Sequence, residues 1–288
     1  MPIATIKLMG GLGNQLFQVF TLLAYADQYR MNISLPNTLY SGERNIQYFN
    51  NIFSRLKDYV RAPISTPTEY YEPSFQYTPI PAGLSRQSLV LDGYFQSPLY
   101  FNTFKLAIFS QLHLGPKMNK VRQQHPEINF PQTIAMHFRL GDYLDKTEFH
   151  PILPLIYYTR SVQFILSHQS HPTPSQVLVF FEKADEDRIN DNTHQLSVQF
   201  PQLQFRRVDT NIPDWQQLLM ISLCQHHIIA NSTFSWWGAY LGHISHVGSS
   251  GTGRVTCYPS TWFGTALPNH STADLFPPGN GWSRVSCQ

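Results

Sequence analysis

The 288-residue chain has few cysteines and few charges, and both shortages exclude whole classes of protein. Its three cysteines, Cys224, Cys257 and Cys287, are odd in number and far apart, which argues against a disulfide framework and against a structural zinc site. Charged residues make up only 13% of the chain, and the net charge is +2. Because the longest basic run is Arg206-Arg207, the sequence lacks the basic stripe that nucleic-acid binding needs. We therefore expect any bound anion to be small.

The chain also lacks a charged leader, an apolar signal core and a hydrophobic run of membrane length. Residues 1–8 enter a strand pattern at once. We therefore expect a cytoplasmic protein without a membrane span, and unpaired cysteines are compatible with a reducing compartment. With 42% hydrophobic residues, the chain can bury one large core or two moderate ones, and two domains is the more natural division at this length.

The first part of the chain predicts a strand, a glycine turn and a helix, followed by a stretch rich in proline and tyrosine. In that stretch, residues 36–83, we predict little regular structure. Asn14 is the expected helix cap, because it follows the turn Gly10-Gly11-Leu12-Gly13 and precedes a helical spacing of apolar residues. The expected elements are a strand at residues 3–9, a helix from Asn14 to Gln28, a strand at 89–92 and a helix between Pro98 and a break at Gly115-Pro116.

From residue 133 onward, strand and helix patterns alternate, which predicts a parallel sheet with helices on both faces. Ligands of such sheets bind beyond the carboxyl ends of the strands. We place the domain boundary in the proline-containing stretch 126–131, which gives an N-terminal domain of residues 1–128 and a C-terminal domain of residues 129–288. The expected strands are 133–138, 176–181, 204–208, 226–230 and 255–258, and the expected helices are 155–168, 185–196, 214–224 and 235–241.

One strand of this predicted sheet ends in a polar corner, Asn231-Ser232-Thr233-Phe234-Ser235, that can start a helix. The first amides of a helix lack intrahelical partners and carry the positive end of its dipole, so they can bind a phosphate. The hydroxyls of Ser232, Thr233 and Ser235 can donate to the same phosphate, although Ser232 or Thr233 can equally cap the helix. We expect the following Trp236 and Trp237 to be packing residues rather than a sugar platform.

A second corner, His137-Phe138-Arg139-Leu140-Gly141-Asp142-Tyr143, follows another strand. The guanidinium of Arg139 is a fixed fork of donors that suits a diphosphate. The alternative is a salt bridge between Arg139 and Asp142, with His137 as a core residue. However, an arginine at the mouth of a parallel sheet is costly to bury without an anionic partner. The two corners together predict a cleft for a diphosphate.

Two other motifs have competing interpretations. The glycine turn lets backbone amides approach a phosphate. It can equally be a structural turn, because the dinucleotide fingerprint needs a third glycine where Leu16 stands. The spacing of Asp185-Glu186-Asp187 can hold a divalent metal. We prefer to place these carboxylates in the first turn of a helix, where the dipole favours negative charge. We therefore expect neither a metal site nor a cofactor.

Four ordered motifs resemble those of the alpha-1,2-fucosyltransferases, glycosyltransferase family 11, and the resemblance extends from Gly10 to Leu241. It implies an α/β fold of two Rossmann-like domains facing across a cleft, the glycosyltransferase-B type. It also implies inverting, metal-independent transfer of fucose from GDP-fucose to the 2-hydroxyl of a terminal β-galactose, as in lactose. The motifs are Gly10-Gly11-Leu12-Gly13-Asn14-Gln15-Leu16-Phe17-Gln18, Gly93-Tyr94-Phe95-Gln96-Ser97, His137 to Tyr143 and Cys224 to Trp237, and Pro154-Leu155-Ile156-Tyr157-Tyr158 is similar to a further family segment.

The resemblance implies a GDP-fucose-binding C-terminal domain and an acceptor-binding N-terminal domain. We expect charge developing on the phosphates to be stabilised by Arg139 and the helix amides. Asp142 is the first candidate base, although it can instead orient Arg139. Where many relatives have a Ser-Asp-Asp segment, this chain has Glu182-Lys183. The predicted donor-binding residues are Gly13, Asn14, Gln15, Arg139, Asn231, Ser232, Thr233, Phe234 and Ser235, the predicted catalytic residues are His137, Arg139 and Asp142, and Glu148 and His150 are further candidates for the base or for acceptor binding.

Three alternatives stay open: a non-catalytic glycan-binding module, a glycosyltransferase that uses another nucleotide sugar, and a nucleotide-dependent oxidoreductase. The missing third glycine argues against the oxidoreductase. Two phosphate corners would be superfluous in a simple lectin. A donor assay separates all three from the fucosyltransferase.

Overall fold

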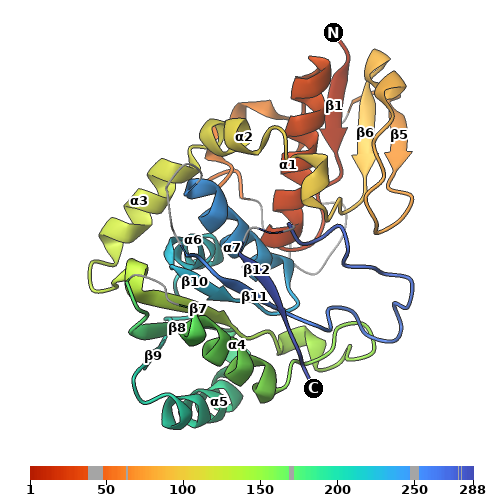
Figure 1. Ribbon diagram of the computed structural model, residues 1–288. Helices are drawn as coiled ribbons and strands as arrows, with labels where there is room; N and C mark the ends of the chain where they lie inside the picture. The colour runs from red at the N-terminus through yellow and green to blue at the C-terminus, as the bar shows by residue number, and fades with distance from the viewer. Residues whose placement is uncertain (38–47, 63, 169–171, 247–252, 278, 280) are drawn as a thin grey trace. The chain divides into compact units, whose positions relative to one another are not determined.

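The computed structural model describes residues 1–37, 48–62, 64–168, 172–246, 253–277, 279 and 281–288. These residues form two compact units (Figure 1). Unit 1 comprises Met1–Lys117 and His270–Pro277, and unit 2 comprises Met118–Asn269 and Pro278–Gln288. Each unit contains a parallel sheet with helices packed on it, which confirms the predicted α/β class with two Rossmann-like units.

The structure divides the chain between Lys117 and Met118, whereas the sequence placed the boundary after residue 128. The stretch 126–131 belongs to unit 2. The Gln225 N–H donates to the Phe130 carbonyl at 3.1 Å, so the stretch is fixed to the following strands. Prolines indicate a turn in the chain, but long-range contacts such as this hydrogen bond determine to which unit the turn belongs.

After the long segment of unit 2, the chain returns to unit 1 at His270–Pro277, which the sequence did not predict. Asp274 holds this segment there by two hydrogen bonds. Its carboxylate accepts from the Tyr77 N–H at 3.2 Å, and its carbonyl accepts from Ser97 Oγ at 2.7 Å. These partners are far apart in sequence, so local patterns could not predict the return.

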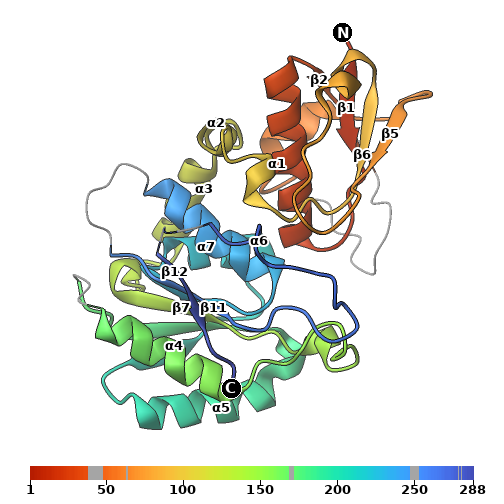
Figure 2. The ribbon, with the colours of Figure 1, turned by 45° about the vertical axis from the view of Figure 1, so that its right-hand side comes forward.

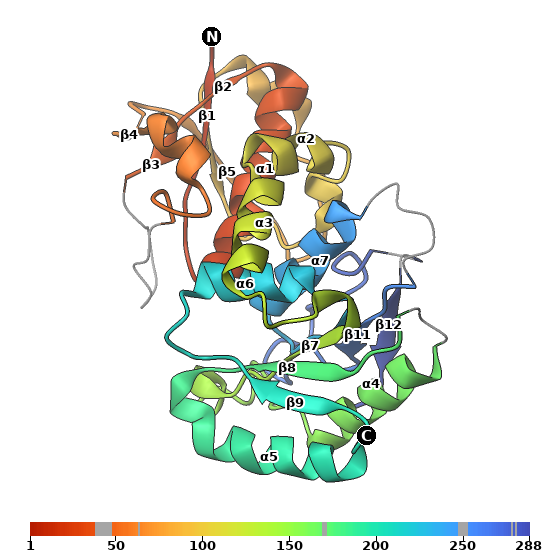
Figure 3. The same ribbon diagram turned by 90° about the vertical axis from the view of Figure 1, so that its left-hand side faces the viewer.

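Unit 1 is built on a parallel sheet with the strand order β2-β1-β6-β5, called here the N-terminal sheet. Its elements are β1 (Ile3–Ile6), α1 (Leu12–Tyr29), β2 (Asn32–Ile33), β3 (Leu35–Pro36), η1 (Ser54–Tyr59), β4 (Val60–Arg61), β5 (Thr68–Tyr71), η2 (Ala82–Arg86), β6 (Leu89–Asp92), η3 (Pro98–Tyr100) and α2 (Lys105–Gln111), followed by α3 (Leu114–Gln124), which crosses the boundary. Figure 3 shows α1 on one side of β1 and β5, with β3 and β4 on the other.

Helix α1 begins at Leu12, so the prediction that Asn14 caps it is wrong. The cap position is Gly11, and Gly10 has a φ of +74°, which lets the chain turn directly into the helix. Asn14 lies inside the first turn, where its Oδ1 accepts a hydrogen bond from Gln96 Nε2 at 3.1 Å.

Two other expectations for this part of the chain are also wrong. Strand β5 lies in the stretch that was predicted to be irregular, because its pairing with β6 compensates for the weak local pattern. Gly115-Pro116 does not end a helix but lies in the first turn of α3. Proline is tolerated there, since the first helical N–H groups have no intrahelical acceptor.

Unit 2 is built on a parallel sheet with the order β12-β11-β10-β7-β8-β9, called here the C-terminal sheet. Its elements are η4 (Phe130–Gln132), β7 (Thr133–His137), η5 (Gly141–Tyr143), α4 (Leu155–Ser167), β8 (Gln176–Phe180), η6 (Lys183–Asp185), α5 (Glu186–Gln199), β9 (Gln204–Arg207), α6 (Asp214–Leu223), β10 (His226–Ile228), α7 (Thr233–Ser245), β11 (Thr256–Pro259) and β12 (Trp282–Val285). Helices α4 and α5 cover one face of this sheet and α6 and α7 the other (Figure 2).

The two faces of the C-terminal sheet differ in polarity. The α4 and α5 side is a continuous apolar core. The α6 and α7 side also buries polar groups: the His227 ring contacts the Ile221 carbonyl of α6, and the His137 ring lies 5.6 Å from the Phe234 ring of α7. The apolar core includes Ile134, Met136, Val177, Val179 and Ile228 from the strands, Tyr157 and Val162 from α4, and Ile189 and Leu196 from α5.

All five strands expected after residue 132 are present, with ends that differ by one or two residues. Strand β12 was not predicted. Helix α7 begins at Thr233 instead of Ser235, and Glu186 and Asp187 occupy the first turn of α5 as we preferred.

The apolar helix α7 lies inside unit 2. Trp236 and Trp237 are fully buried, which confirms their predicted packing role. Among the helices of the described chain, none is long and apolar enough to cross a membrane.

Candidate functional site

The strand order of the C-terminal sheet creates a switch point between β7 and β10. Read from β9, the order corresponds to the 3-2-1-4-5-6 order of dinucleotide-binding sheets, with β7 as strand 1 and β10 as strand 4. The chain leaves these two strands toward helices on opposite faces, an arrangement that in sheets of this kind creates a binding crevice at the carboxyl ends. Both polar corners found in the sequence follow these two strands. Their residues therefore meet where a ligand of such a sheet binds.

The corner after β10 is the N-terminus of α7. Ser232 is its cap, because Ser232 Oγ accepts from the Phe234 N–H at 3.3 Å. Ser235 Oγ donates to the Ser232 carbonyl at 3.4 Å. This geometry assigns the cap role to Ser232 rather than Thr233. It also places the positive end of the α7 dipole at the carboxyl edge of the sheet.

The corner after β7 contains Arg139, whose guanidinium forms an ion pair with the Glu182 carboxylate. Glu182 follows the neighbouring strand β8. The guanidinium also lies over the Tyr143 ring, 5.0 Å from its centroid, and the Arg139 side chain is only 12% exposed. The alternative salt bridge to Asp142 concerns a side chain that lies outside the described part of the structure.

A second carboxylate from the segment after β8 contacts the same corner. The Gly141 N–H donates to both carboxylate oxygens of Asp185, at 3.0 and 3.1 Å. Burial raises the pKa of the Asp185 carboxyl. Gly141 has a φ of +35°, and a Cβ at this position would lie 2.6 Å from Glu182 Oε2, so the position requires glycine. The cationic and amide donors of this corner therefore both have carboxylate partners.

Tyr143 connects the two corners. Its hydroxyl donates to the Asn231 carbonyl at 3.1 Å, and its ring stacks on His150 with centroids 4.5 Å apart. The Asn231 amide in turn donates to the carbonyls of Pro151 and Trp262, at 3.0 and 3.2 Å. Residues 143–151 are thereby fixed against the start of α7.

Two buried polar atoms at the switch point lack a hydrogen-bond partner within the described residues: His137 Nδ1 and Asn231 Oδ1. His137 is 6% exposed and Asn231 is 2% exposed. Burial, and to a lesser extent the Arg139 charge, lowers the pKa of His137 to about 3, so its imidazole is neutral at pH 7. Buried polar groups in native proteins are nearly always paired. These two atoms are therefore candidates for contact with a ligand or a water molecule.

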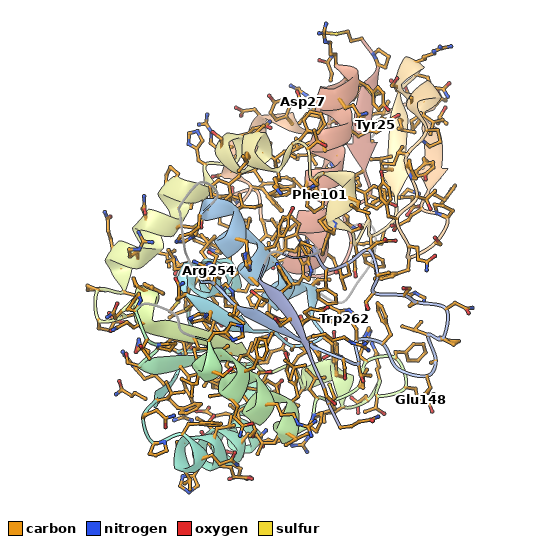
Figure 4. The ribbon with its side chains drawn as sticks, viewed as in Figure 1. Tyr25, Asp27, Phe101, Glu148, Arg254 and Trp262 are labelled. Carbon is orange, nitrogen blue, oxygen red and sulfur yellow. The ribbon has the colours of Figure 1, made fainter. Side chains whose placement is uncertain are left out.

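The two further candidates for the base differ in their surroundings. The Glu148 side chain is exposed at the surface (Figure 4), whereas His150 is half-buried against Tyr143. The Glu148 carbonyl accepts from the Ala266 N–H at 2.9 Å, so the backbone there is fixed although the carboxylate is exposed. Their catalytic roles stay predictions.

The predicted donor residues of unit 1 lie at the start of α1, after β1 and beside the segment that follows β6. Gly13 is buried inside α1, and Asn14 bonds Gln96 as described above. Gln15 is buried and donates through Nε2 to the Gly10 carbonyl at 3.0 Å. A contact with the donor stays a prediction for all three residues.

Sequence reasoning missed two residues that organise the segments after the strands, Glu182 in unit 2 and Gln18 in unit 1. Gln18 is fully buried on α1, where its Oε1 accepts from the Met9 N–H and its Nε2 donates to the Gly93 carbonyl, both at 3.1 Å. A glutamine in an apolar helix and a glutamate directly after an apolar strand were the available signals.

The model for glycosyl transferase family 11 matches residues 3–248 of the chain. The chain belongs to glycosyltransferase family 11. It is 26% identical over 294 aligned positions to the alpha-1,2-colitosyltransferase of Escherichia coli, covering 91% of this chain and 93% of that protein. It is 28% identical over 137 positions to the O-antigen biosynthesis glycosyltransferase WbnK of E. coli, covering 46% of this chain and 39% of WbnK. The crystal structure of fucosyltransferase NodZ from Bradyrhizobium aligns with a TM-score of 0.47 and 13% identity, over 84% of this chain and 94% of that one.

Proposed function

We propose that this family 11 glycosyltransferase transfers L-fucose from GDP-fucose to the 2-hydroxyl of a terminal β-galactose, with inversion and without a metal ion. The observation that carries the proposal is the buried His137 Nδ1, which has no partner among the described residues and lies beside Arg139 and the start of α7. Asn231 Oδ1 can only accept, so it suits a hydroxyl of the donor rather than its diphosphate. A diphosphate ester provides oxygens for the Arg139 guanidinium and the α7 amides. The 1,2 linkage in the name of the E. coli colitosyltransferase supports the 2-hydroxyl as the acceptor.

In the proposed mechanism, the acceptor oxygen forms a bond to the fucose anomeric carbon as the bond from that carbon to the GDP oxygen breaks. The electron pair of the broken bond leaves with GDP, and the hydroxyl proton passes to a base. Charge therefore grows on the diphosphate in the transition state, where Arg139 and the α7 dipole stabilise it. The neutral His137 can donate or accept one hydrogen bond, but it cannot supply positive charge.

Arg139 can contact a diphosphate without losing Glu182. A guanidinium has five N–H donors, and a carboxylate uses two of them at most in a forked pair. Glu182 then restricts the orientation of the guanidinium before the donor arrives, which lowers the entropy lost on binding.

For the base we propose Asp142, with His150 and Glu148 as the next candidates. Asp142→Asn, assayed across pH, separates the base from an orienting role. Loss of a base removes the acid limb of the rate profile along with most of the turnover. A residue that only orients Arg139 leaves the shape of the profile unchanged when it is replaced.

The colitosyl relative favours a second candidate, in which the transferred sugar is colitose instead of fucose. The same phosphate contacts serve both donors, so only the sugar-binding part of the site distinguishes them. The donor sugar is therefore tested separately from the nucleotide.

The decisive experiment measures GDP release and product formation from GDP-fucose, with and without lactose. GDP-colitose, UDP-sugars and ADP-sugars replace the donor in parallel, and EDTA is added to one series. We expect lactose-dependent release from GDP-fucose that EDTA does not reduce, and a β-to-α inversion in the linkage of the product. Faster transfer from GDP-colitose would assign the second candidate, and binding of lactose without release of GDP would assign a glycan-binding module.

A further inference from the structure

One face of the N-terminal sheet is only partly buried and carries polar residues, which is unusual for a parallel sheet. Both faces of parallel sheets are usually buried, and their strands are then apolar throughout. Here β1 alternates: Ala4 and Ile6 are buried, whereas Thr5 and Lys7 point to the opposite face and are only partly buried. This second face is therefore built for contact with water or with a polar ligand.

A cavity of about 240 Å³ lies on this face. The register places Thr5, Val90 and Glu69 in one row across β1, β6 and β5, and all three line the cavity. Ser34 and Arg61 line it from the β3 and β4 segments. The volume is below the roughly 300 to 1,000 Å³ of pockets for drug-sized ligands, so one small ring fits.

The charges at the cavity are balanced and held in place. Lys7 Nζ bonds Asp92 Oδ2 at 2.8 Å and Glu69 Oε2 at 3.4 Å, and it lies 5.6 Å from the centroid of the Tyr71 ring. The Tyr71 hydroxyl donates to Glu69. The lining cations Lys7 and Arg61 are matched by the lining carboxylate of Glu69 and by Asp92, which pairs with Lys7 from outside the lining. A phosphate or a second cation would disturb this balance, whereas a neutral ligand with several hydroxyls matches it.

We propose that this cavity is a subsite for one sugar ring of the acceptor glycan. Sugar hydroxyls both donate and accept, so they match the ammonium, guanidinium, carboxylate and hydroxyl groups that line the cavity. The apolar C–H face of the ring can pack on Val90 and on Pro36 of β3. This inference rests on the proposed function and adds to it a binding site outside the reacting centre.

The position of the cavity along the sheet determines which sugar it holds. Val90 is three residues before Gly93, which is about 10 Å at the rise of a parallel strand. Reacting groups of such sheets gather at the carboxyl-end loops, here residues 93–96 beside α1. The galactose that accepts fucose lies at that loop, and the cavity holds a sugar farther along the same glycan.

The test compares a long acceptor with a short one. Ala62→Trp fills the cavity from its exposed rim, and Glu69→Gln removes one carboxylate while Asp92 still holds Lys7. Asp27→Asn is the matched control, because Asp27 is an exposed carboxylate on α1 (Figure 4). The acceptors are a β-galactosyl-terminated tetrasaccharide and methyl β-galactoside, and GDP-fucose hydrolysis without an acceptor measures the donor site.

We expect Ala62→Trp to raise the KM for the tetrasaccharide about tenfold and Glu69→Gln to raise it severalfold. The KM for methyl β-galactoside, the hydrolysis rate and all values for Asp27→Asn stay unchanged. Equal effects on the two acceptors, or no effect on either, would overturn the subsite.

A binding measurement separates failure of the subsite from failure of the proposed function. Saturation-transfer NMR with the free tetrasaccharide needs no turnover. If the wild-type protein contacts the tetrasaccharide and Ala62→Trp removes that contact, the subsite stands even where no fucose is transferred. If the contact is equal in both proteins, the subsite is wrong even where transfer occurs.

Discussion

The two units pair the donors at their strand ends in a similar way, although the donors differ. In unit 1, the Glu72 carboxylate after β5 accepts from the N–H groups of Tyr94 and Phe95, both at 2.8 Å. In unit 2, Glu182 after β8 pairs with Arg139. Each unit therefore uses a glutamate that follows one strand to occupy donors that follow the neighbouring strand.

The two units differ in which buried polar atoms near the strand ends lack a hydrogen-bond partner within the residues that the structure describes. The amide side chains of Gln15 and Gln18 in unit 1 donate to the backbone carbonyls of Gly10 and Gly93, which follow β1 and β6. In unit 2, His137 and Asn231 each keep a buried atom without a partner in the described structure. Thr21 and Tyr70 of unit 1 also keep a buried atom without a partner in the described structure, but only in unit 2 does such an atom lie beside an arginine, which suits an anionic ligand. This difference is why we propose that the nucleotide diphosphate binds to unit 2.

Arg139→Ala is the most direct test of the proposal that the diphosphate binds to unit 2. Loss of one preorganised donor to developing charge typically costs about 10²–10³ in turnover, and we expect a loss of that size. The measurement is kcat for GDP-fucose with a saturating acceptor. Arg207→Ala is the control: it removes an exposed arginine of the same unit that pairs with Glu186, and we expect less than a twofold change. Near-normal turnover of Arg139→Ala would move the diphosphate away from unit 2.

Acidification should unfold unit 2 before unit 1. Burial, helped by nearby positive charge, lowers the pKa of His137 to about 3, of His226 to about 4 and of His243 to about 3. Each folded pKa lies below the unfolded value of about 6.5, so the stabilisation is complete above pH 6.5 and is lost as the pH falls toward 3. The expected loss at pH 5 is about 2 kcal/mol for each histidine.

Tryptophan fluorescence isolates this effect, because all five tryptophans of the chain lie in unit 2. Urea midpoints recorded from pH 7.5 to pH 5 should fall steadily. Arg254 is a buried cation that contacts His227 and His246 (Figure 4), so it adds to the cost of protonating this region. A midpoint that does not change over this range would show that the imidazoles titrate normally.

The sequence predicted the C-terminal sheet better than the rest of the molecule for a physical reason. Its strands are apolar runs bounded by clear turns, and the helices between them have a periodic pattern. Strand β5 has the sequence Thr68-Glu69-Tyr70-Tyr71, in which only the pairing with β6 provides the strand signal. Strand β12 is likewise specified by its neighbour β11. Tertiary pairing overrides weak local preference in both cases.

The sequence predicted the positions of the candidate residues at the strand ends, but not which side chains pair with them. Arg139, Asn231 and Ser232 lie at the switch point because strand ends and helix starts are local signals. The pairing of Arg139 with Glu182 joins residues that are 43 positions apart, and no spacing rule specifies it. Asn14 was placed as a cap because the positive φ of Gly10, which starts the helix earlier, is a property of the folded turn.

Gln18→Leu tests whether the start of α1 in unit 1 has a structural role rather than a catalytic one. It leaves the Met9 N–H and the Gly93 carbonyl without their buried partner, and unpaired buried groups cost about 1–3 kcal/mol each. We expect the free energy of unfolding to fall by about 2–6 kcal/mol, with kcat of the folded protein nearly unchanged. Helix content measured by circular dichroism follows the unfolding, and Gln28→Leu on the exposed end of α1 is the control. A variant of normal stability with low kcat would instead give Gln18 a part in catalysis.

Tyr143→Phe should have the smallest effect, and it tests whether the two corners of unit 2 act together. The substitution removes the hydrogen bond to the Asn231 carbonyl but keeps the ring beneath Arg139 and against His150. A single neutral hydrogen bond contributes about 0.5–1.5 kcal/mol, so kcat/KM should fall about tenfold at most. The double variant with Arg139→Ala should then lose less than the product of the two single losses, because the hydroxyl matters only while Arg139 binds the diphosphate. Fully multiplicative losses would mean that the corners bind the donor independently.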